Sequence, residues 1–131
     1  MVHTAHKVAD DPEILSAAQA LLVLIKSQPG GEQHIQNAVG SYIALGNLGN
    51  ASDALGDPRR AIEYYEQALA IAREIGDRRG EGNHLGNLGN AYYRLGYPSQ
   101  AIEYHQQALA IAREIGDRRR EGNHLDSLGL A

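Results

Sequence analysis

The chain has 131 residues, of which 43% are hydrophobic, and its formal net charge is −4 with the two signs interspersed. This composition is enough for one elongated hydrophobic core, and the absence of cysteine excludes disulfide bonds and cysteine-ligated metal sites. Because the charges are interspersed, the sequence has no cluster of basic residues of the kind that binds nucleic acid, and we expect no nucleic-acid partner.

Residues 1–31 differ from the rest of the chain. Residues 1–10 are polar and of mixed charge, so we expect a frayed terminus, and the acidic residues around Asp10 argue against a signal peptide. The run Ile14–Ile25 is the most apolar, but about a dozen residues are too few to span a bilayer, and we expect no membrane partner. The run begins at Asp11-Pro12, a helix cap followed by proline. We therefore interpret residues 11–31 as a degenerate helix and a turn.

Residues 32–76 form the first clear unit. Its apolar side chains recur at helical spacing as far as Leu55, which predicts one long helix. Asp57-Pro58 then marks the start of a second helix, and Gly76 marks its end. We expect the first helix to be about two turns longer than its counterpart in the next unit.

Residues 77–116 repeat this unit with a 40-residue period. Between residues 61–91 and 101–131, 25 of 31 aligned positions are identical. The first half of the unit is rich in glycine and asparagine, whose low helix propensity favours a loop. The helical spacing of apolar side chains around Leu85 favours a helix instead. We predict that helix, with glycines that let another helix approach closely, and a second helix after Tyr97, a poor capping residue.

Residues 117–131 begin a third unit, and a fixed period of this size is the signature of a solenoid. Leu125 and Leu128 are expected to pack on the preceding helix, around Ala101 and Ala108. The sequence therefore predicts an all-α solenoid of antiparallel helix pairs, with about 2.5 repeats in a single domain.

A short motif in the second unit has a familiar form. The segment from Leu85 to Tyr92 (Leu-x-x-Leu-Gly-x-x-Tyr), followed by Ala101 and Ala108, resembles the tetratricopeptide repeat (TPR). The 40-residue period and the Leu-Gly-Asn triplets resemble the variety found in LGN/Pins-type adaptors and, more distantly, in kinesin light chains. Leu85 stands where the family has tryptophan, and His105 where it has phenylalanine. The resemblance implies a protein-interaction scaffold whose first helices line a concave groove.

The first helix of each unit has polar side chains on one face, and these positions recur with the 40-residue period. At about 100° per residue, its side chains lie opposite the leucine face. The candidate peptide-binding residues on this face are Asn47, Asn50, Asn83, Asn87, Asn90, Arg94 and Asn123. By the resemblance they point into the groove, where amide donors and acceptors suit a peptide backbone. The alternative is an ordinary solvated helix face on which asparagine is tolerated.

Other polar motifs have simpler interpretations. His84, His105 and His124 are interpreted as packing residues of the repeat, because no carboxylate pattern accompanies them as metal ligands would require. The charged runs 77–79 and 117–120 are interpreted as helix caps and solvated surface, with a patch for an anionic partner as the alternative. No nucleophile with a neighbouring base is evident, so we expect no catalytic residue, metal or cofactor.

These observations predict a non-enzymatic, cytoplasmic scaffold that binds a peptide segment of a protein partner in its groove. One alternative is a structural unit that forms a homodimer or larger oligomer through exposed array ends, because an open array end leaves apolar surface uncovered. The other alternative is a regulatory fragment of a larger signalling protein.

Overall fold

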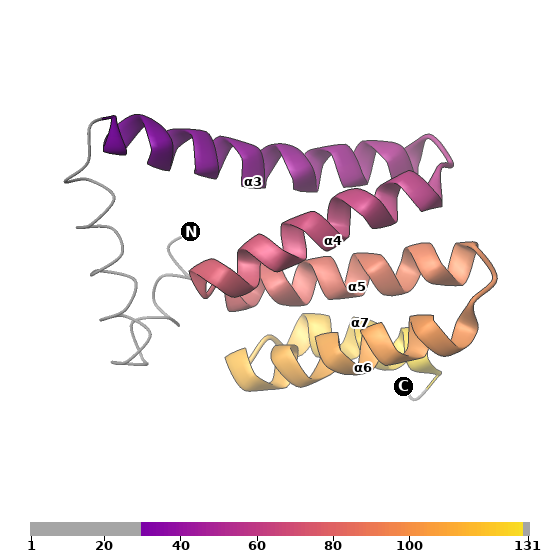
Figure 1. The fold of residues 1–131 in the computed structure, drawn as a ribbon. Coiled ribbons are helices and arrows are strands. Elements are labelled where there is room, and N and C mark those ends of the chain that lie inside the picture. The colour runs from indigo at the N-terminus through magenta and orange to yellow at the C-terminus, as the bar shows by residue number, and fades with distance from the viewer. Residues whose placement is uncertain (1–29, 130–131) are drawn as a thin grey trace.

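The computed structural model describes residues 30–129 (Figure 1). The expectations for residues 1–29 lie outside the described residues. Within the described part the chain is all-α, without strands, and short turns connect its helices. In chain order the helices are α3 (Gly31–Ala54), α4 (Pro58–Ile75), α5 (Arg78–Arg94), α6 (Pro98–Ile115) and α7 (Arg118–Leu128).

The helix boundaries follow the capping signals in the sequence. Asp57, Asp77 and Asp117 each accept a hydrogen bond from the backbone N–H three residues later, at 3.2, 2.8 and 3.1 Å. Tyr97 precedes α6 and its side chain makes no such bond, as expected for a poor capping residue. Gly76 ends α4 in the left-handed conformation, with φ of 72°, a region that glycine enters without steric cost.

The helices α3 and α5 are rich in asparagine and glycine, and both confirm the helices predicted from the spacing of apolar residues. α5 is helical over 17 residues although its propensity favours a loop, and Leu85, Leu88 and Ala91 are buried along it. α3 has 24 residues, which makes it about two turns longer than α5, as expected. Burial of one face therefore outweighs the weak intrinsic preference of these sequences for helix.

The helices form two layers. Each helix packs against the next one in the chain, and these are the main contacts between elements. Contacts also join alternate helices: Tyr42 of α3 meets His84 of α5 edge-on, with ring centroids 5.7 Å apart, and Arg79 of α5 pairs with Asp117 at the start of α7. The first helices α3, α5 and α7 thus form one layer, and α4 and α6 form the other, with α7 behind α6 in Figure 1.

The hydrophobic core lies between the layers. It contains the buried side chains Ala61, Ile62, Tyr65, Leu69, Leu85, Leu88, Ala91, Ala108 and Ile111. The packing of α7 on α6 confirms the contact predicted for the third unit. The buried side chain of α7 is His124, however, whereas Leu125 and Leu128 stay partly exposed.

Glycines stand where helices approach most closely. A Cβ added at Gly89 would lie 2.7 Å from ring atoms of His105, and one at Gly49 would lie 2.5 Å from the ring of Tyr65. The two contacts are equivalent, because each member of the second pair lies one repeat before its counterpart in the first. The close approach of two helices predicted for the glycines of residues 77–116 is confirmed at Gly89, and Gly49 makes the same contact one repeat earlier.

Gly80 lies near the start of α5, where an alanine in place of glycine is ordinarily harmless. In the structure, the Tyr42 hydroxyl and the Asp77 carboxylate occupy the space that a Cβ at Gly80 would enter. Tyr42 donates a 2.7 Å hydrogen bond to Asp77, and burial together with this bond raises the pKa of Tyr42, which keeps the hydroxyl protonated. Alanine at residue 80 would therefore disturb the contact between α3 and α5.

Candidate interaction surface

The outer surface of α3, α5 and α7, turned away from α4 and α6, is called the first-helix face here. Along this face, α5 is aligned with α3 in the same way as α7 is aligned with α5. A Cβ at Gly46 of α3 would lie 3.5 Å from His84 of α5, and a Cβ at Gly86 would lie 2.8 Å from His124 of α7. Because the second contact is the first one shifted by a single repeat, equivalent positions of the three helices stand side by side in rows.

These rows gather the predicted peptide-binding residues onto one surface. One row contains Ile43, Asn83 and Asn123, the next contains Asn47, Asn87 and Ser127, and a third contains Asn50 and Asn90. Most of the predicted residues are exposed, whereas Asn83 and Asn87 are partly buried. Among the described residues, the Oδ1 atom of Asn83 is buried without a hydrogen-bond partner.

Two predicted residues have partners inside the fold. Asn50 accepts a 2.8 Å hydrogen bond from the hydroxyl of Tyr65, whose pKa is raised by burial and then by the negative charge of Asp53. Arg94 pairs with Asp53, which joins α5 to α3. Both side chains therefore hold the array together, and neither is free to bind a partner without giving up a contact.

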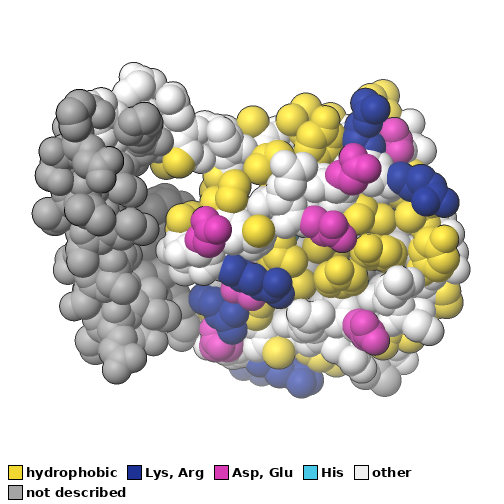
Figure 2. Space-filling model, viewed as in Figure 1, with side chains coloured by type: hydrophobic (Ala, Val, Ile, Leu, Met, Phe, Trp, Pro, Cys, Tyr) yellow, Lys and Arg dark blue, Asp and Glu magenta, His cyan; other side chains and the backbone are white. Residues whose placement is uncertain are grey.

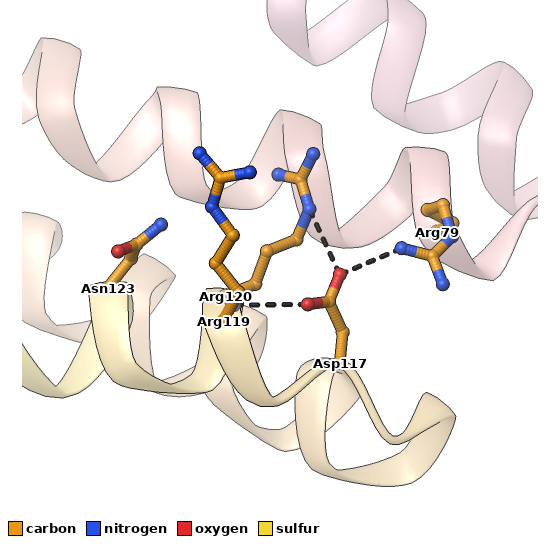
Figure 3. A pocket seen from close by; sticks show the side chains of 5 residues that line it. All are labelled: Arg79, Asp117, Arg119, Arg120 and Asn123. Atoms are coloured by element: carbon orange, nitrogen blue, oxygen red, sulfur yellow. Dashed lines mark hydrogen bonds and ion pairs between the residues drawn. The ribbon is translucent and has the colours of Figure 1, made fainter.

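A cationic depression lies at the start of α7 (Figure 3). It measures about 500 Å³ and is lined by Arg79, Asp117, Arg119, Arg120 and Asn123. The Asp117 carboxylate pairs with Arg79 at 2.8 Å and with Arg120 at 3.2 Å. Of these residues, Asn123 was predicted to bind peptide. The other four belong to the charged runs 77–79 and 117–120, for which a patch for an anionic partner was the alternative interpretation.

The carboxylate in this depression stays ionised. Partial burial by itself raises the pKa of Asp117, but the backbone N–H of Arg120 and the guanidinium of Arg79 outweigh burial, so the pKa is lowered. Within the described part of the chain, the side chain of Arg119 makes no hydrogen bond or ion pair. The depression therefore keeps an excess of positive charge.

Comparison with known protein families agrees with this architecture. The family model described as tetratricopeptide repeat matches residues 41–114, which is more than half of the chain. The chain belongs to the tetratricopeptide repeat family. None of the curated proteins matches it. Tetratricopeptide repeats generally mediate protein–protein interactions and are typically non-catalytic scaffolds.

The histidines of this tetratricopeptide array are packing residues, as predicted. His105 is buried against Gly89, and its ring centroid lies 5.7 Å from that of His124, which is buried beside Gly86. His84 lies between Tyr42 and Tyr65. Burial is the main cause that lowers the pKa of all three side chains. Among the described residues, no group of three or more potential ligand side chains could hold a metal ion.

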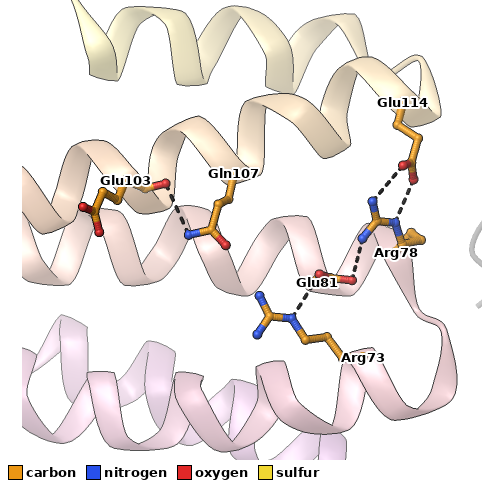
Figure 4. Close-up of polar contacts among 6 residues, drawn as sticks. All are labelled: Arg73, Arg78, Glu81, Glu103, Gln107 and Glu114. Carbon is orange, nitrogen blue, oxygen red and sulfur yellow. Dashed lines mark hydrogen bonds and ion pairs between the residues drawn. The ribbon is translucent and has the colours of Figure 1, made fainter.

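A second ionic network joins the tetratricopeptide repeats away from the first-helix face (Figure 4). Glu81 is buried and pairs with Arg73 of α4 at 3.1 Å and with Arg78 at 2.9 Å. Arg78 also donates two 2.7 Å hydrogen bonds to Glu114 of α6, and these bonds are the main reason that its pKa is raised. All four groups are matched in charge, so we assign this network to repeat packing.

The opposite face of the tetratricopeptide array has a different character. Figure 2 shows the side of α4 and α6, where acidic and basic side chains are scattered among hydrophobic ones. No helix in the described part of the chain is long and apolar enough to cross a membrane.

Proposed function

We propose that this tetratricopeptide array is a protein-interaction module that binds an extended segment of a partner on its first-helix face. The observation that carries the proposal is the set of amides in register on three adjacent helices. Asn47, Asn87, Asn90 and Asn123 make no side-chain hydrogen bond within the described part of the chain. A peptide backbone supplies both the donors and the acceptors that these amides require.

The alternative, a solvated helix face, explains the amides less well. Asparagine is a poorer helix former than lysine or glutamate, which solvate a surface at lower cost in helix stability. We further propose an adaptor role of the LGN/Pins kind, on the basis of the 40-residue period and the Leu-Gly-Asn triplets.

Removing two unpaired amides from neighbouring first helices is expected to weaken partner binding. Asn47→Ala combined with Asn87→Ala should lower affinity by about 1–3 kcal/mol in total, because two hydrogen bonds to the partner are lost. Both positions stand in one row, and neither side chain makes a hydrogen bond within the described part of the chain. Peptides selected from a phage-displayed library of random twelve-residue sequences serve as the probe, and fluorescence anisotropy measures their affinity.

The matched control removes two amides from the second helices. Gln67 and Gln107 are also equivalent residues of successive repeats, and each side chain donates only to a backbone carbonyl one turn earlier, at 3.2 and 3.4 Å. Gln67→Ala combined with Gln107→Ala should leave peptide affinity unchanged. Equal losses in the two double variants would contradict binding on the first-helix face.

Self-association is the second function that an observation favours. On α3, the hydrophobic side chains of Val39, Ile43 and Leu48 are 52%, 57% and 44% exposed, and exposed apolar surface often marks an association site. If a homodimer forms, light scattering over a concentration series should show the mass rising toward twice that of the chain. A monomeric mass up to high micromolar concentration would exclude it and leave peptide binding as the proposed role.

A further inference from the structure

Three tyrosines of the second repeat form a cluster at the turn between α5 and α6. Tyr92 and Tyr104 are stacked, with ring centroids 5.3 Å apart and an angle of 12° between the rings. Tyr97 meets Tyr92 edge-on, with ring centroids 6.4 Å apart. Tyr97 is 44% exposed and the other two side chains are partly exposed, so the cluster keeps ring surface open to solvent. These three side chains are called the aromatic patch here.

The first repeat has no such cluster. The equivalent residues there are Ser52, Asp57 and Tyr64. Asp57 caps α4 through a 3.2 Å hydrogen bond, whereas Tyr97 makes no cap bond at the start of α6. The backbone is nearly the same at both residues, with φ and ψ of −113° and 77° at Asp57 and of −112° and 73° at Tyr97. The second repeat therefore has an aromatic ring in place of a stabilising cap, and such departures from local rules are typical of functional positions.

The charges near the patch leave an excess of negative charge. Within the described part of the chain, the charged side chains of α4 and α6 that form no ion pair are Arg59, Glu63, Glu66, Glu74 and Glu103. On this side of the array, hydrophobic side chains gather into one area with acidic side chains at its edge (Figure 2).

One of these glutamates lies at the aromatic patch itself. The carboxylate of Glu66 accepts a 3.3 Å hydrogen bond from the hydroxyl of Tyr92. Burial, and then the negative charge of Glu66, raise the pKa of Tyr92 to about 12, so the hydroxyl stays protonated. A cation placed against the rings would therefore have a carboxylate without an ion-pair partner within reach.

Aromatic rings beside such a carboxylate suit an arginine side chain. The face of a tyrosine ring attracts a cation, and the planar guanidinium of arginine stacks on aromatic rings more often than the ammonium of lysine does. A guanidinium also donates paired hydrogen bonds to a carboxylate. An uncharged aromatic ligand would gain no ion pair from Glu66, and an anionic ligand would be repelled by it.

We infer that the aromatic patch is a second interaction site, which binds an arginine side chain of a basic protein segment and pairs it with Glu66. The patch involves α4, the end of α5 and α6, whereas the proposed peptide site lies on the outer surface of α3, α5 and α7. Binding at the patch therefore does not depend on the amides of the first-helix face. The array would hold two protein segments, one on each side.

Peptides of defined charge test this site directly. The probe is a fluorescein-labelled peptide of alternating arginine and serine, and fluorescence anisotropy measures its affinity. It is compared with versions that contain lysine or citrulline, the uncharged analogue of arginine. The arginine peptide should bind about fivefold more tightly than the lysine peptide, and the citrulline peptide should not bind. If the arginine peptide does not bind, or binds no more tightly than the lysine peptide, the inference is wrong.

Two variants of Tyr97 test the role of the rings. Tyr97→Asn and Tyr97→Asp should each weaken binding of the arginine peptide about fivefold, because a ring is lost. Both introduce a good capping residue for α6, so urea denaturation should show no loss of stability. The aspartate variant also adds a negative charge, which would strengthen binding if the basic peptide were held only by general attraction. Unchanged or tighter binding in Tyr97→Asp would overturn the inference.

The matched control for the ring is Tyr93→Asn. Tyr93 is 71% exposed and, within the described part of the chain, makes no ring contact with the aromatic patch. Its replacement should leave affinity for the arginine peptide unchanged. A loss as large as that in Tyr97→Asn would mean that binding does not take place at the patch.

Glu66→Gln tests the carboxylate. Glutamine keeps an acceptor for Tyr92, and Gln106 is the equivalent residue of the second repeat. Binding of the arginine peptide should weaken about fivefold. Glu74→Gln is the matched control, because it removes the same charge from an exposed residue near the other end of α4. Equal losses in the two variants would show a general charge effect and contradict the inference.

The two proposed sites are told apart by exchanging variants and probes. Asn47→Ala combined with Asn87→Ala should leave affinity for the arginine peptide unchanged, and Tyr97→Asn should leave unchanged the affinity of library peptides bound on the first-helix face. If the arginine peptide responds to the asparagine variants and not to Tyr97→Asn, the inference fails and the proposed function stands. If the library yields no binder, the proposed function fails and the aromatic patch is judged by the arginine peptide alone.

Discussion

Gly89→Leu is expected to destabilise the array strongly. Gly89 is buried in α5, and a Cβ there would already lie 2.7 Å from ring atoms of His105 in α6. A leucine adds three more carbons at a contact that cannot open without separating two helices. Overpacking of this kind costs about 1–3 kcal/mol or more. Urea denaturation followed by circular dichroism should therefore show a lower midpoint.

The matched control places the same side chain on an open surface. Gly40 lies in α3, is exposed, and has no atom within 4 Å of a Cβ added to it. Gly40→Leu should be neutral or stabilising, because leucine has a helix propensity about 0.8 kcal/mol better than glycine. Similar midpoints for the two variants would mean that α5 and α6 do not cross at Gly89.

The helices could be predicted because their signals are local. Asp57, Asp77 and Asp117 cap helices through residues only three positions away, and Gly76 ends a helix by its own backbone preference. The helical nature of α5 needed one more argument, the spacing of Leu85 and its neighbours, because propensity favoured a loop. The 40-residue period then determined which segments were equivalent.

The candidate site could be predicted only in part. The geometry of a single helix shows which side chains share a face, but it does not show which side chains of a neighbouring helix bind them. Angular position placed Asn50 and Arg94 on the polar face, but it did not show that Tyr65 and Asp53 bind them. The depression depends on the lateral register that brings Arg79 to Asp117, residues 38 positions apart. A clue was present in the sequence, because arginines 79 and 119 occupy equivalent positions.

Acidification from pH 8 to pH 5 is expected to lower the free energy of unfolding. His105 and His124 are buried and His84 is partly buried, so each of the three would have to accept a proton inside the packed layers. His84 faces the rings of Tyr42 and Tyr65, and burial disfavours its protonation more than the negative charge of Asp77 favours it. His105 and His124 face each other, and Arg120 further disfavours protonation of His124, although Asp117 favours it.

The direction of the effect follows from the lowered pKa values. In the unfolded chain histidine titrates near pH 6.5, whereas in the folded chain the neutral form is favoured. The contribution to stability is therefore fully present above about pH 6.5 and is lost as the pH falls through the folded pKa values. The contribution of Asp117 to stability is lost only at a pH more acidic than that at which the histidines titrate, because the pKa of Asp117 lies below the ordinary value of an aspartate.

His105→Tyr should make the array less sensitive to acid. The equivalent residue of the preceding repeat is Tyr65, which packs against Gly49 as His105 packs against Gly89, so the ring fits this site. The hydroxyl of Tyr65 bonds to Asn50, and the hydroxyl introduced at residue 105 would face Asn90, the equivalent amide. Urea denaturation at several pH values should show a smaller loss of stability between pH 8 and pH 5 than in the unaltered protein. The same loss in both proteins would mean that His105 is not held neutral by the fold.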